Sequence, residues 1–374
     1  MDSCAIAFSP ENDAAAFAAA PAAPAVFALF GSEGAEPYVS RSANLRRRLM
    51  RILGEHGGAS KRLSLRGRVA RIEFWLVASE FETQVVLYRV LRAWFRQHYR
   101  ERLRFRPAPV IKLDLRNPYP RACVTARITG VGGPSLYYGP FASRAAAEKF
   151  LNDSLDLFRL RRCPDDLHPD PAFPGCIYSE MKMCLAPCFR GCSDEAYAEE
   201  ARRVRQYLDS GGESLRRELE AERDRSSSAL EFEAAAAAHQ RLEKAGLAAA
   251  QMPELARRID QLNGLAVMPS IHAGCVRFFP IARGLIAPDF DFPVSVVSAA
   301  AKPVSMEARI REALDGAPAA PKSSLAELED SLALLKRWYF RSQKAGELFL
   351  ASPAGELPMR KIVRGIARVL ETKL

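Results

Sequence analysis

Apolar residues recur along this chain with two different periods, and each period predicts one kind of element. Up to about residue 160, short apolar runs predict strands, and apolar positions three to four residues apart predict amphipathic helices. The expected elements are strands at 26–30, 38–39, 72–78, 110–113 and 122–128, and helices at 44–53, 80–100 and 142–160. A turn from Gly31 to Gly34 joins the first two strands, and Asn44 caps the first helix.

The second half of the chain is richer in charged helical patterns. Helices are predicted at 194–209, 213–258, 324–341 and 359–370, and strands at 274–280 and 292–297. The whole pattern predicts an α+β fold, made of a small mixed-sheet domain, a cysteine region, a helical hairpin and a small C-terminal α/β domain.

Residues 1–23 stand apart because Ala and Pro dominate them, and this low-complexity composition predicts disorder. The Ala run follows Asp2, Glu11 and Asp13 rather than basic residues, so we expect no signal peptide and a cytoplasmic location. No run of about twenty apolar residues occurs, so we expect no membrane association.

Positive charge is concentrated in the N-terminal part of the chain. The sequence has 54 Lys and Arg against 44 Asp and Glu, a formal net charge of +10. Arginines recur from Arg41 to Arg71 and again from Arg89 to Arg106 with few carboxylates between them. Clustered arginine is typical of phosphate binding, so we expect sequence-independent, salt-sensitive binding of DNA. The expected DNA contacts are Arg41, Arg46, Arg47 and Arg51.

Four cysteines, Cys163, Cys176, Cys184 and Cys188, share one segment rich in Pro and Gly. Such a cluster indicates a metal site or disulfides, and a cytoplasmic location disfavours disulfides. Four thiolates suit a [4Fe–4S] cluster or tetrahedral zinc. Only the last pair has the close spacing usual for zinc, which favours iron–sulfur. Cys192 is a nearby fifth thiol that could replace Cys188.

Four motifs follow one another between residue 24 and about residue 245. They are the segment from Pro24 through Tyr38 to Arg48, the run Tyr137–Phe141, the cysteines ending in Cys184-Leu-Ala-Pro-Cys188, and the run Leu230–Ala236. In this order they resemble the N-terminal half of the UvrC family of excinuclease subunits. The first resembles the opening of a GIY-YIG nuclease domain, and the last resembles the UVR motif.

The resemblance divides the chain into six parts. These are a disordered start at 1–23, a GIY-YIG nuclease-like domain at 24–106, connecting strands and a helix at 107–162, the four-cysteine region at 163–192, a UVR-like helical hairpin at 193–258 and a C-terminal α/β region at 259–374. The family's RNase H-like and helix-hairpin-helix domains are not expected in the last part.

The resemblance implies a cofactor and a partner. In the family the four cysteines hold an iron–sulfur cluster, for which we expect a structural role. The hairpin contacts a UvrB-like helicase subunit, and the matching residues are Leu230, Phe232, Glu233 and Ala236. The usual Arg-Asp pair of the UVR motif is His239-Gln240 here, so a simple helical hairpin is the alternative.

The resemblance also implies the catalytic positions. Tyr38 and Arg48 match the family's catalytic tyrosine and arginine at the right separation. The metal-binding glutamate, however, aligns with Leu87, which offers no oxygen to a cation. Phe27 and Ser40 also differ from the family's motifs, which have a tyrosine and a glycine at these positions. We therefore expect a DNA-binding protein of the nucleotide excision repair type with an impaired nuclease site.

Two alternatives remain open. An active GIY-YIG endonuclease would need Mg²⁺ or Mn²⁺ and another carboxylate, from Glu73, Glu80 or Glu82. A protein-interaction module would use its arginines for solubility alone. DNA cleavage separates the first alternative from our expectation, and salt-dependent DNA binding separates the second.

Overall fold

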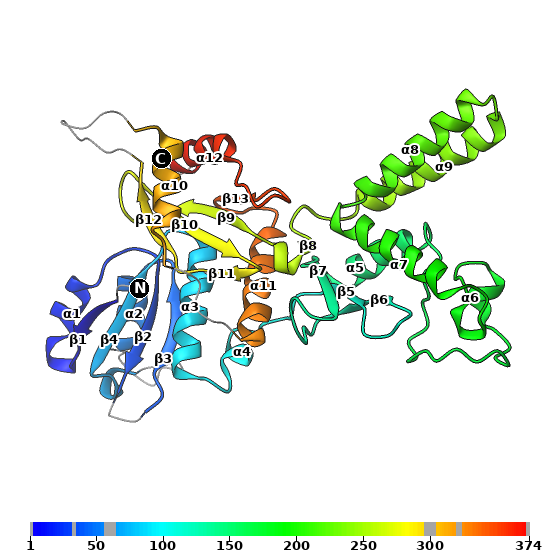
Figure 1. The fold of residues 1–374 in the computed structure, drawn as a ribbon. Helices are drawn as coiled ribbons and strands as arrows, with labels where there is room; N and C mark the ends of the chain where they lie inside the picture. Colours follow the sequence, from blue (N-terminus) through cyan, green and yellow to red (C-terminus); the bar gives the residue numbers. More distant parts are fainter. Residues whose placement is uncertain (1–2, 32–34, 56–64, 295–303, 319–323, 372–374) are drawn as a thin grey trace.

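The computed structural model describes residues 3–31, 35–55, 65–294, 304–318 and 324–371. Three small antiparallel sheets and their helices form an α+β fold, as the sequence predicts (Figure 1). The N-terminal and C-terminal parts lie together, and the middle part extends from them toward a projecting helical hairpin (Figure 1). Within the described residues, no helix has the length and hydrophobicity needed to cross a bilayer.

The N-terminal sheet has helices on both faces. Its strand order is β1 (Cys4–Ala7), β4 (Arg71–Leu76), β2 (Ala25–Phe30) and β3 (Tyr38–Ser42). Each pairing is antiparallel, so the prediction of a mixed sheet is wrong. Side chains alternate across β2, and Phe27 packs with α2 (Leu45–Leu53) whereas Val26 packs with α3 (Glu80–Trp94). Part of the expected turn, residues 32–34, lies outside the described residues.

Helix α2 begins as its sequence predicts. The backbone N–H of Arg47 donates to Asn44 Oδ1 at 3.0 Å, which satisfies one of the free N–H groups of the first turn. Four apolar side chains of this helix are buried, namely Leu45, Leu49, Ile52 and Leu53. The arginines of the helix are left on its outer side or at its edge.

Residues 3–23 are folded, so the prediction of disorder is wrong. β1 pairs with β4, and α1 (Asp13–Ala19) follows a short 3-10 helix at Pro10–Asn12. Phe8, Ala16 and Ala20 are buried in the core that α2 closes. Small alanine side chains let α1 approach α2 closely, so the composition taken for disorder belongs to a packed helix.

The middle part joins a second sheet to the cysteine region and the hairpin. Its strands have the order β6 (Arg121–Thr125), β5 (Val110–Asp114), β7 (Ser135–Gly139) and β8 (Arg257–Arg258), and its helices are α5 (Arg144–Leu155), α6 (Ile177–Glu180), α7 (Asp194–Asp209), α8 (Glu213–Ser228) and α9 (Phe232–Ala249). The helix expected at 213–258 is broken at Leu230, whose φ is +62°. Helices α8 and α9 therefore form a hairpin that projects from the body (Figure 1).

The C-terminal part forms the third sheet. Its strands are β9 (Gly264–Pro269), β10 (Cys275–Ala282), β11 (Leu285–Ile286), β12 (Phe290–Pro293) and β13 (Glu347–Leu350), and its helices are α10 (Met306–Asp315), α11 (Leu325–Tyr339) and α12 (Met359–Glu371). One face packs against α10 and α12, and the other packs against α11 and α3. Of the expected strand at 292–297, residues 295–297 lie outside the described residues.

Helix α3 is shared by the N-terminal and C-terminal parts. Val86 and Val90 face the N-terminal sheet, whereas Phe81 and Val85 face α11 and the C-terminal sheet. The helix ends at Trp94, and α4 (Tyr99–Arg102) is separate from it. A helix that is apolar around most of its circumference is buried on several sides, and α3 follows this rule.

Candidate nucleic-acid interface and cysteine region

Tyr38 and Arg48, the two positions that match the GIY-YIG motif, lie side by side. Arg48 Nη2 donates to the Tyr38 hydroxyl at 3.3 Å, and both residues are half-buried. The Tyr38 ring lies 6.2 Å from that of Phe27, on the α2 face of the sheet. Arg48 Nε is buried without a hydrogen-bond partner. This pair can present a guanidinium and a phenol hydroxyl to one phosphate group.

Arg47 and Arg51 lie on the exposed side of α2. Neither makes an ion pair within the described part of the chain. Unpaired guanidinium groups on one helix turn are suited to neutralising phosphates, because each is free to form a bidentate contact. These two arginines are therefore exposed at the positions where the sequence predicts DNA contacts.

Arg46 and Arg41 are engaged within the protein. Arg46 donates from Nε to the Ala20 carbonyl at 2.7 Å and from Nη2 to the Ala18 carbonyl at 3.2 Å. These carbonyls belong to the C-terminal end of α1, where they have no partner in the helix. Arg46 therefore holds α1 on α2, a role hidden from the sequence by the predicted disorder. Arg41 forms an ion pair with Glu80, at the start of α3.

Leu87 lies away from the Tyr38–Arg48 pair. It is half-buried and packs with Val39, on the α3 face, whereas Tyr38 packs on the α2 face. Adjacent residues of a strand point to opposite faces, which explains the separation. The position aligned with the metal-binding glutamate thus contributes to an apolar core.

The three carboxylates considered as substitutes are each bound to an arginine other than Arg48. Glu73 pairs with Arg71 on β4, and Glu80 pairs with Arg41. Glu82 is buried and lies 3.2 Å from Arg277 Nε on β10. Within the described residues, none of the three is paired with Arg48 or hydrogen-bonded to Tyr38.

Glu82 belongs to a buried charge cluster between α3 and the C-terminal sheet. Arg277 Nε lies 2.7 Å from Asp289, and Arg277 Nη1 lies 3.2 Å from Asp291. Arg89 of α3 also pairs with Asp289. Burial raises the pKa of Glu82 to about 7, although the Ala78 N–H and Arg277 stabilise its charge. Burial also opposes ionisation of Asp289, but Arg89 and Arg277 outweigh it and lower the pKa of that carboxyl.

Replacing Glu82 with glutamine should remove a pH dependence of stability. In the folded protein its pKa is about 7, compared with 4.5 for an ordinary glutamate. The folded state therefore binds this proton more tightly than the unfolded state. The carboxyl stabilises most below its unfolded pKa, and this stabilisation is lost as the pH rises through its folded pKa.

Between about pH 5 and about pH 8, the free energy of unfolding of the wild-type protein should fall by roughly 2–3 kcal/mol relative to Glu82→Gln. Glutamine keeps an oxygen that can accept from the Ala78 N–H, so the variant should fold. Urea denaturation at several pH values measures the difference. Parallel stability curves for the two proteins would contradict the account of Glu82.

Two of the four thiols of the cysteine segment lie beside the core of the middle part. Cys163 and Cys188 pack against this core, and the backbone N–H of Ala186 donates to Cys184 Sγ at 3.3 Å. Burial, together with the smaller contributions of the charges of Cys163, Cys188 and Cys176, raises the pKa of Cys184 to about 11.

No group of three or more His, Cys, Asp or Glu in the described residues is arranged to hold a metal ion. The donor set itself, four thiols with an N–H···S hydrogen bond, has the chemistry that iron–sulfur clusters and zinc require. The fifth thiol, Cys192, packs against the same core.

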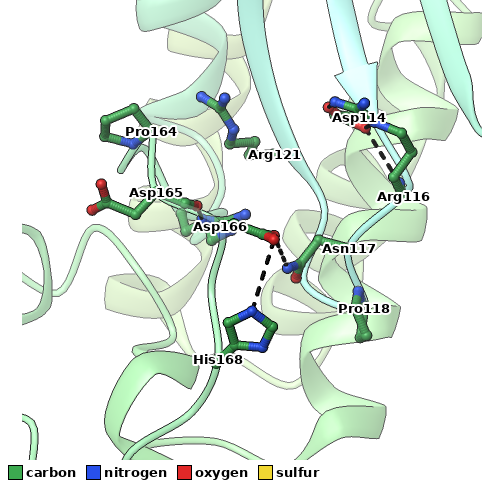
Figure 2. Close-up of a pocket in the computed structure, with 10 residues that line it drawn as sticks. Asp114, Arg116, Asn117, Pro118, Arg121, Pro164, Asp165, Asp166 and His168 are labelled. Atoms are coloured by element: carbon green, nitrogen blue, oxygen red, sulfur yellow. Dashed lines mark hydrogen bonds and ion pairs between the residues drawn. The ribbon is translucent and has the colours of Figure 1, made fainter.

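A polar cavity of about 480 Å³ adjoins the start of the cysteine segment (Figure 2). It is lined by Asp114, Arg116, Asn117, Pro118, Arg121, Arg161, Pro164, Asp165, Asp166 and His168. Figure 2 shows Asp166 between Asn117 and His168, and Arg116 bound to Asp114. This cavity could not be predicted from the sequence, because its residues come from β5, β6, the loop between them and the separate segment 161–168.

Arg161 ties that cavity to the first cysteine. The side chain is buried and donates to the Tyr119 carbonyl at 2.8 Å and to the Asp165 carbonyl at 2.7 Å. Its Nη1 also lies 3.4 Å from Cys163 Sγ. The arginine therefore fixes the beginning of the cysteine segment against the loop between β5 and β6.

The predicted partner-binding residues lie at the tip of the α8–α9 hairpin (Figure 1). Leu230 and Phe232 are 71% and 70% exposed, which is unusual for large apolar side chains. Glu233 and Ala236 are exposed as well. The hairpin therefore presents an apolar tip to solvent, far from the N-terminal sheet.

Comparison with known proteins identifies the middle part of the chain. Residues 108–207 match the family described as "UvrC/Cho excinuclease, middle domain". This match covers β5 to most of α7, including the four cysteines. The resemblance to the UvrC family is thereby confirmed for this part.

Curated relatives agree with this match. The chain is 30% identical over 200 residues to the UvrABC system protein C of Pseudomonas entomophila (strain L48), which covers 53% of this chain and 32% of the relative. It is 30% identical over 207 residues to that of Saccharophagus degradans (strain 2-40 / ATCC 43961 / DSM 17024), covering 54% of this chain and 33% of the relative. The chain thus matches about a third of the length of these relatives. No solved structure matches it.

Proposed function

This chain belongs to the UvrC family through its middle domain, and from that premise we propose that it binds DNA in nucleotide excision repair without cutting it. The observation that carries the proposal is the state of the arginines on α2. Arg47 and Arg51 are exposed and unpaired within the described residues, beside an Arg48 that is held by Tyr38. Contacts of this kind are made to the sugar-phosphate backbone and do not depend on sequence.

We propose that the protein does not cleave DNA because of the residues that surround the Tyr38–Arg48 pair. Phosphodiester hydrolysis by a metal-dependent nuclease needs a carboxylate to hold the cation near the scissile phosphate. Leu87 packs in an apolar core, and Glu73, Glu80 and Glu82 are bound by other arginines. A supercoiled-plasmid assay with Mg²⁺ or Mn²⁺, combined with a salt titration of DNA binding, tests the proposal.

We also propose that Cys163, Cys176, Cys184 and Cys188 hold a [4Fe–4S] cluster, with zinc as the alternative. A bound cluster would link the loops of a segment that has little secondary structure of its own. The presence of four free cysteines in one segment and the N–H···S bond to Cys184 support the proposal. Since the proposed role is structural, no step of catalysis depends on it.

Replacing Cys184 with serine should therefore abolish metal binding and destabilise the middle part. Iron, acid-labile sulfide and zinc measured on anaerobically prepared protein report the loss and identify the metal. Cys275→Ser is the matched control, because Cys275 lies on β10, outside the four-cysteine segment. This variant should keep the metal content of the wild type. Equal metal content in the two variants would refute the assignment.

The hairpin supports a second proposed function, which is recruitment of a UvrB-like helicase subunit. This proposal rests on the exposed apolar tip of the hairpin, because large apolar side chains in solvent commonly mark protein interfaces. An apolar anchor buried at the centre of an interface contributes about 2 kcal/mol or more to the binding free energy. This energy corresponds to a factor of about thirty in affinity.

Phe232→Asp should accordingly weaken binding to a purified UvrB-type subunit by at least about thirtyfold, as measured by calorimetry. Leu247→Asp is the matched control, because Leu247 is 72% exposed on the same hairpin but near its base. Equal losses in the two variants would show that the tip is not the contact.

A further inference from the structure

We propose that the C-terminal part adds a second phosphate-binding group to the DNA interface. Arg337 and Arg341, near the end of α11, act with Arg41 of β3 on the backbone phosphates of DNA. The inference rests on the proposed DNA-binding function. It assigns DNA contacts to a part of the chain that lies outside the matched middle domain.

Two guanidinium groups share one carboxylate at this place, and a third is connected to it through Gln84. Glu80 Oε1 pairs with Arg41 at 2.5 Å and lies 3.5 Å from Arg341 Nη1. It also accepts from Gln84 Nε2 at 2.8 Å, and Gln84 Oε1 accepts from Arg337 Nη1 at 3.1 Å. Within the described residues, Glu80 is the one carboxylate in ion-pair distance of any of these arginines. The cluster therefore keeps an excess of about two positive charges.

The excess charge is accessible to a ligand. The side chains of Arg41 and Arg341 are 47% and 43% exposed. Burial lowers the pKa of Arg337, and the charges of Arg341 and Arg41 lower it further. An anion between these groups would relieve their repulsion, and a phosphate can accept from several guanidinium N–H groups at once.

A recess adjoins the cluster on the side of Arg41, and Arg337 and Arg341 are not among its lining residues. The cavity has a volume of about 390 Å³ and is lined by Arg41, Glu80, Ser42, Ser79 and Thr83, among others. It lies at the first turn of α3, where the helix dipole is positive.

The cluster is held in place by the packing of α11 on α3. The rings of Phe81 and Trp338 lie 5.0 Å apart. The Tyr99 hydroxyl donates to Asp330 at 2.6 Å, and Arg92 pairs with Glu327. Because both helices are fixed, little conformational entropy is lost when the arginines bind a phosphate.

DNA affinity measured against salt concentration tests the inference on the full-length protein. The probe is a fluorescent DNA duplex, and the variant is Arg341→Gln, which removes one exposed charge and no apolar contact. Arg364→Gln is the matched control, because Arg364 is exposed on α12, across the C-terminal sheet. Arg341→Gln should lower the affinity roughly tenfold at low salt and reduce the salt slope by about 0.9, whereas the control should change neither.

The possible outcomes distinguish failure of this inference from failure of the proposed DNA-binding function. If Arg341→Gln binds like the control while Arg47→Gln weakens binding, the inference fails and the DNA-binding function stands. If the wild-type protein shows no salt-dependent binding, both fail. If inorganic phosphate at constant ionic strength stabilises the wild-type protein but not Arg341→Gln, and DNA affinity is equal in both, the site takes free phosphate and the inference is overturned.

Discussion

Replacing Arg277 with glutamine should destabilise the folded protein by about 3–5 kcal/mol. Arg277 is the centre of the buried charge cluster and lies within 3.2 Å of Glu82, Asp289 and Asp291. Without it, Arg89 still pairs with Asp289 and His272 still lies 3.5 Å from Asp291, whereas Glu82 loses its arginine. A buried carboxylate without a partner costs several kcal/mol, and the cluster joins α3 to the C-terminal sheet. The N-terminal and C-terminal parts should therefore dissociate from each other more readily.

Chemical denaturation followed by tryptophan fluorescence measures this change, since Trp338 lies in the core that the two parts share. Arg360→Gln is the control, because Arg360 is exposed on α12 and should change stability by no more than about 0.5 kcal/mol. An Arg277 variant as stable as this control would show that the charge cluster does not hold the parts together.

Replacing both Arg47 and Arg51 with glutamine should lower DNA affinity by roughly a hundredfold at low salt. A hydrogen bond to a charged group contributes about 1.5–3 kcal/mol, or at least tenfold in affinity for each arginine. Loss of two phosphate contacts should also reduce the slope of log affinity against log salt by about 1.8. Fluorescence anisotropy with one duplex across a salt series measures both quantities.

Arg46→Gln is the matched control on the same helix. Its guanidinium is hydrogen-bonded to the carbonyls of Ala18 and Ala20, so its loss should weaken the packing of α1 and leave the salt slope unchanged. If Arg46→Gln lowers the salt slope as much as the other arginine variants do, the assignment of a structural role to Arg46 and of DNA contacts to Arg47 and Arg51 is wrong.

The sequence was sufficient wherever a feature depends on neighbours along the chain. The Asn44 cap and the buried face of α2 both follow from local spacing, and the structure confirms them. Helix α7 has the predicted limits for the same reason, since its Ser193 cap accepts from the Ala196 N–H.

Features that depend on distant contacts were missed. The Ala-rich start folds because Phe8, Ala16 and Ala20 find a core on α2, and composition alone cannot show this. The arginine that pairs with Glu82 comes from β10, far from it in the sequence. The many apolar residues of α3 were a readable sign that it is buried on more than one side, although not of what covers it.

The most direct test of the central claim is a plasmid experiment on the anaerobically prepared, full-length protein. The protein is incubated with supercoiled plasmid and Mg²⁺ or Mn²⁺ beside Arg48→Ala, and binding of the same DNA is followed across a salt series. The account predicts salt-sensitive binding and no nicking by either protein. Nicking by the wild-type protein that disappears in Arg48→Ala would contradict it, because the Tyr38–Arg48 pair would then belong to a working nuclease.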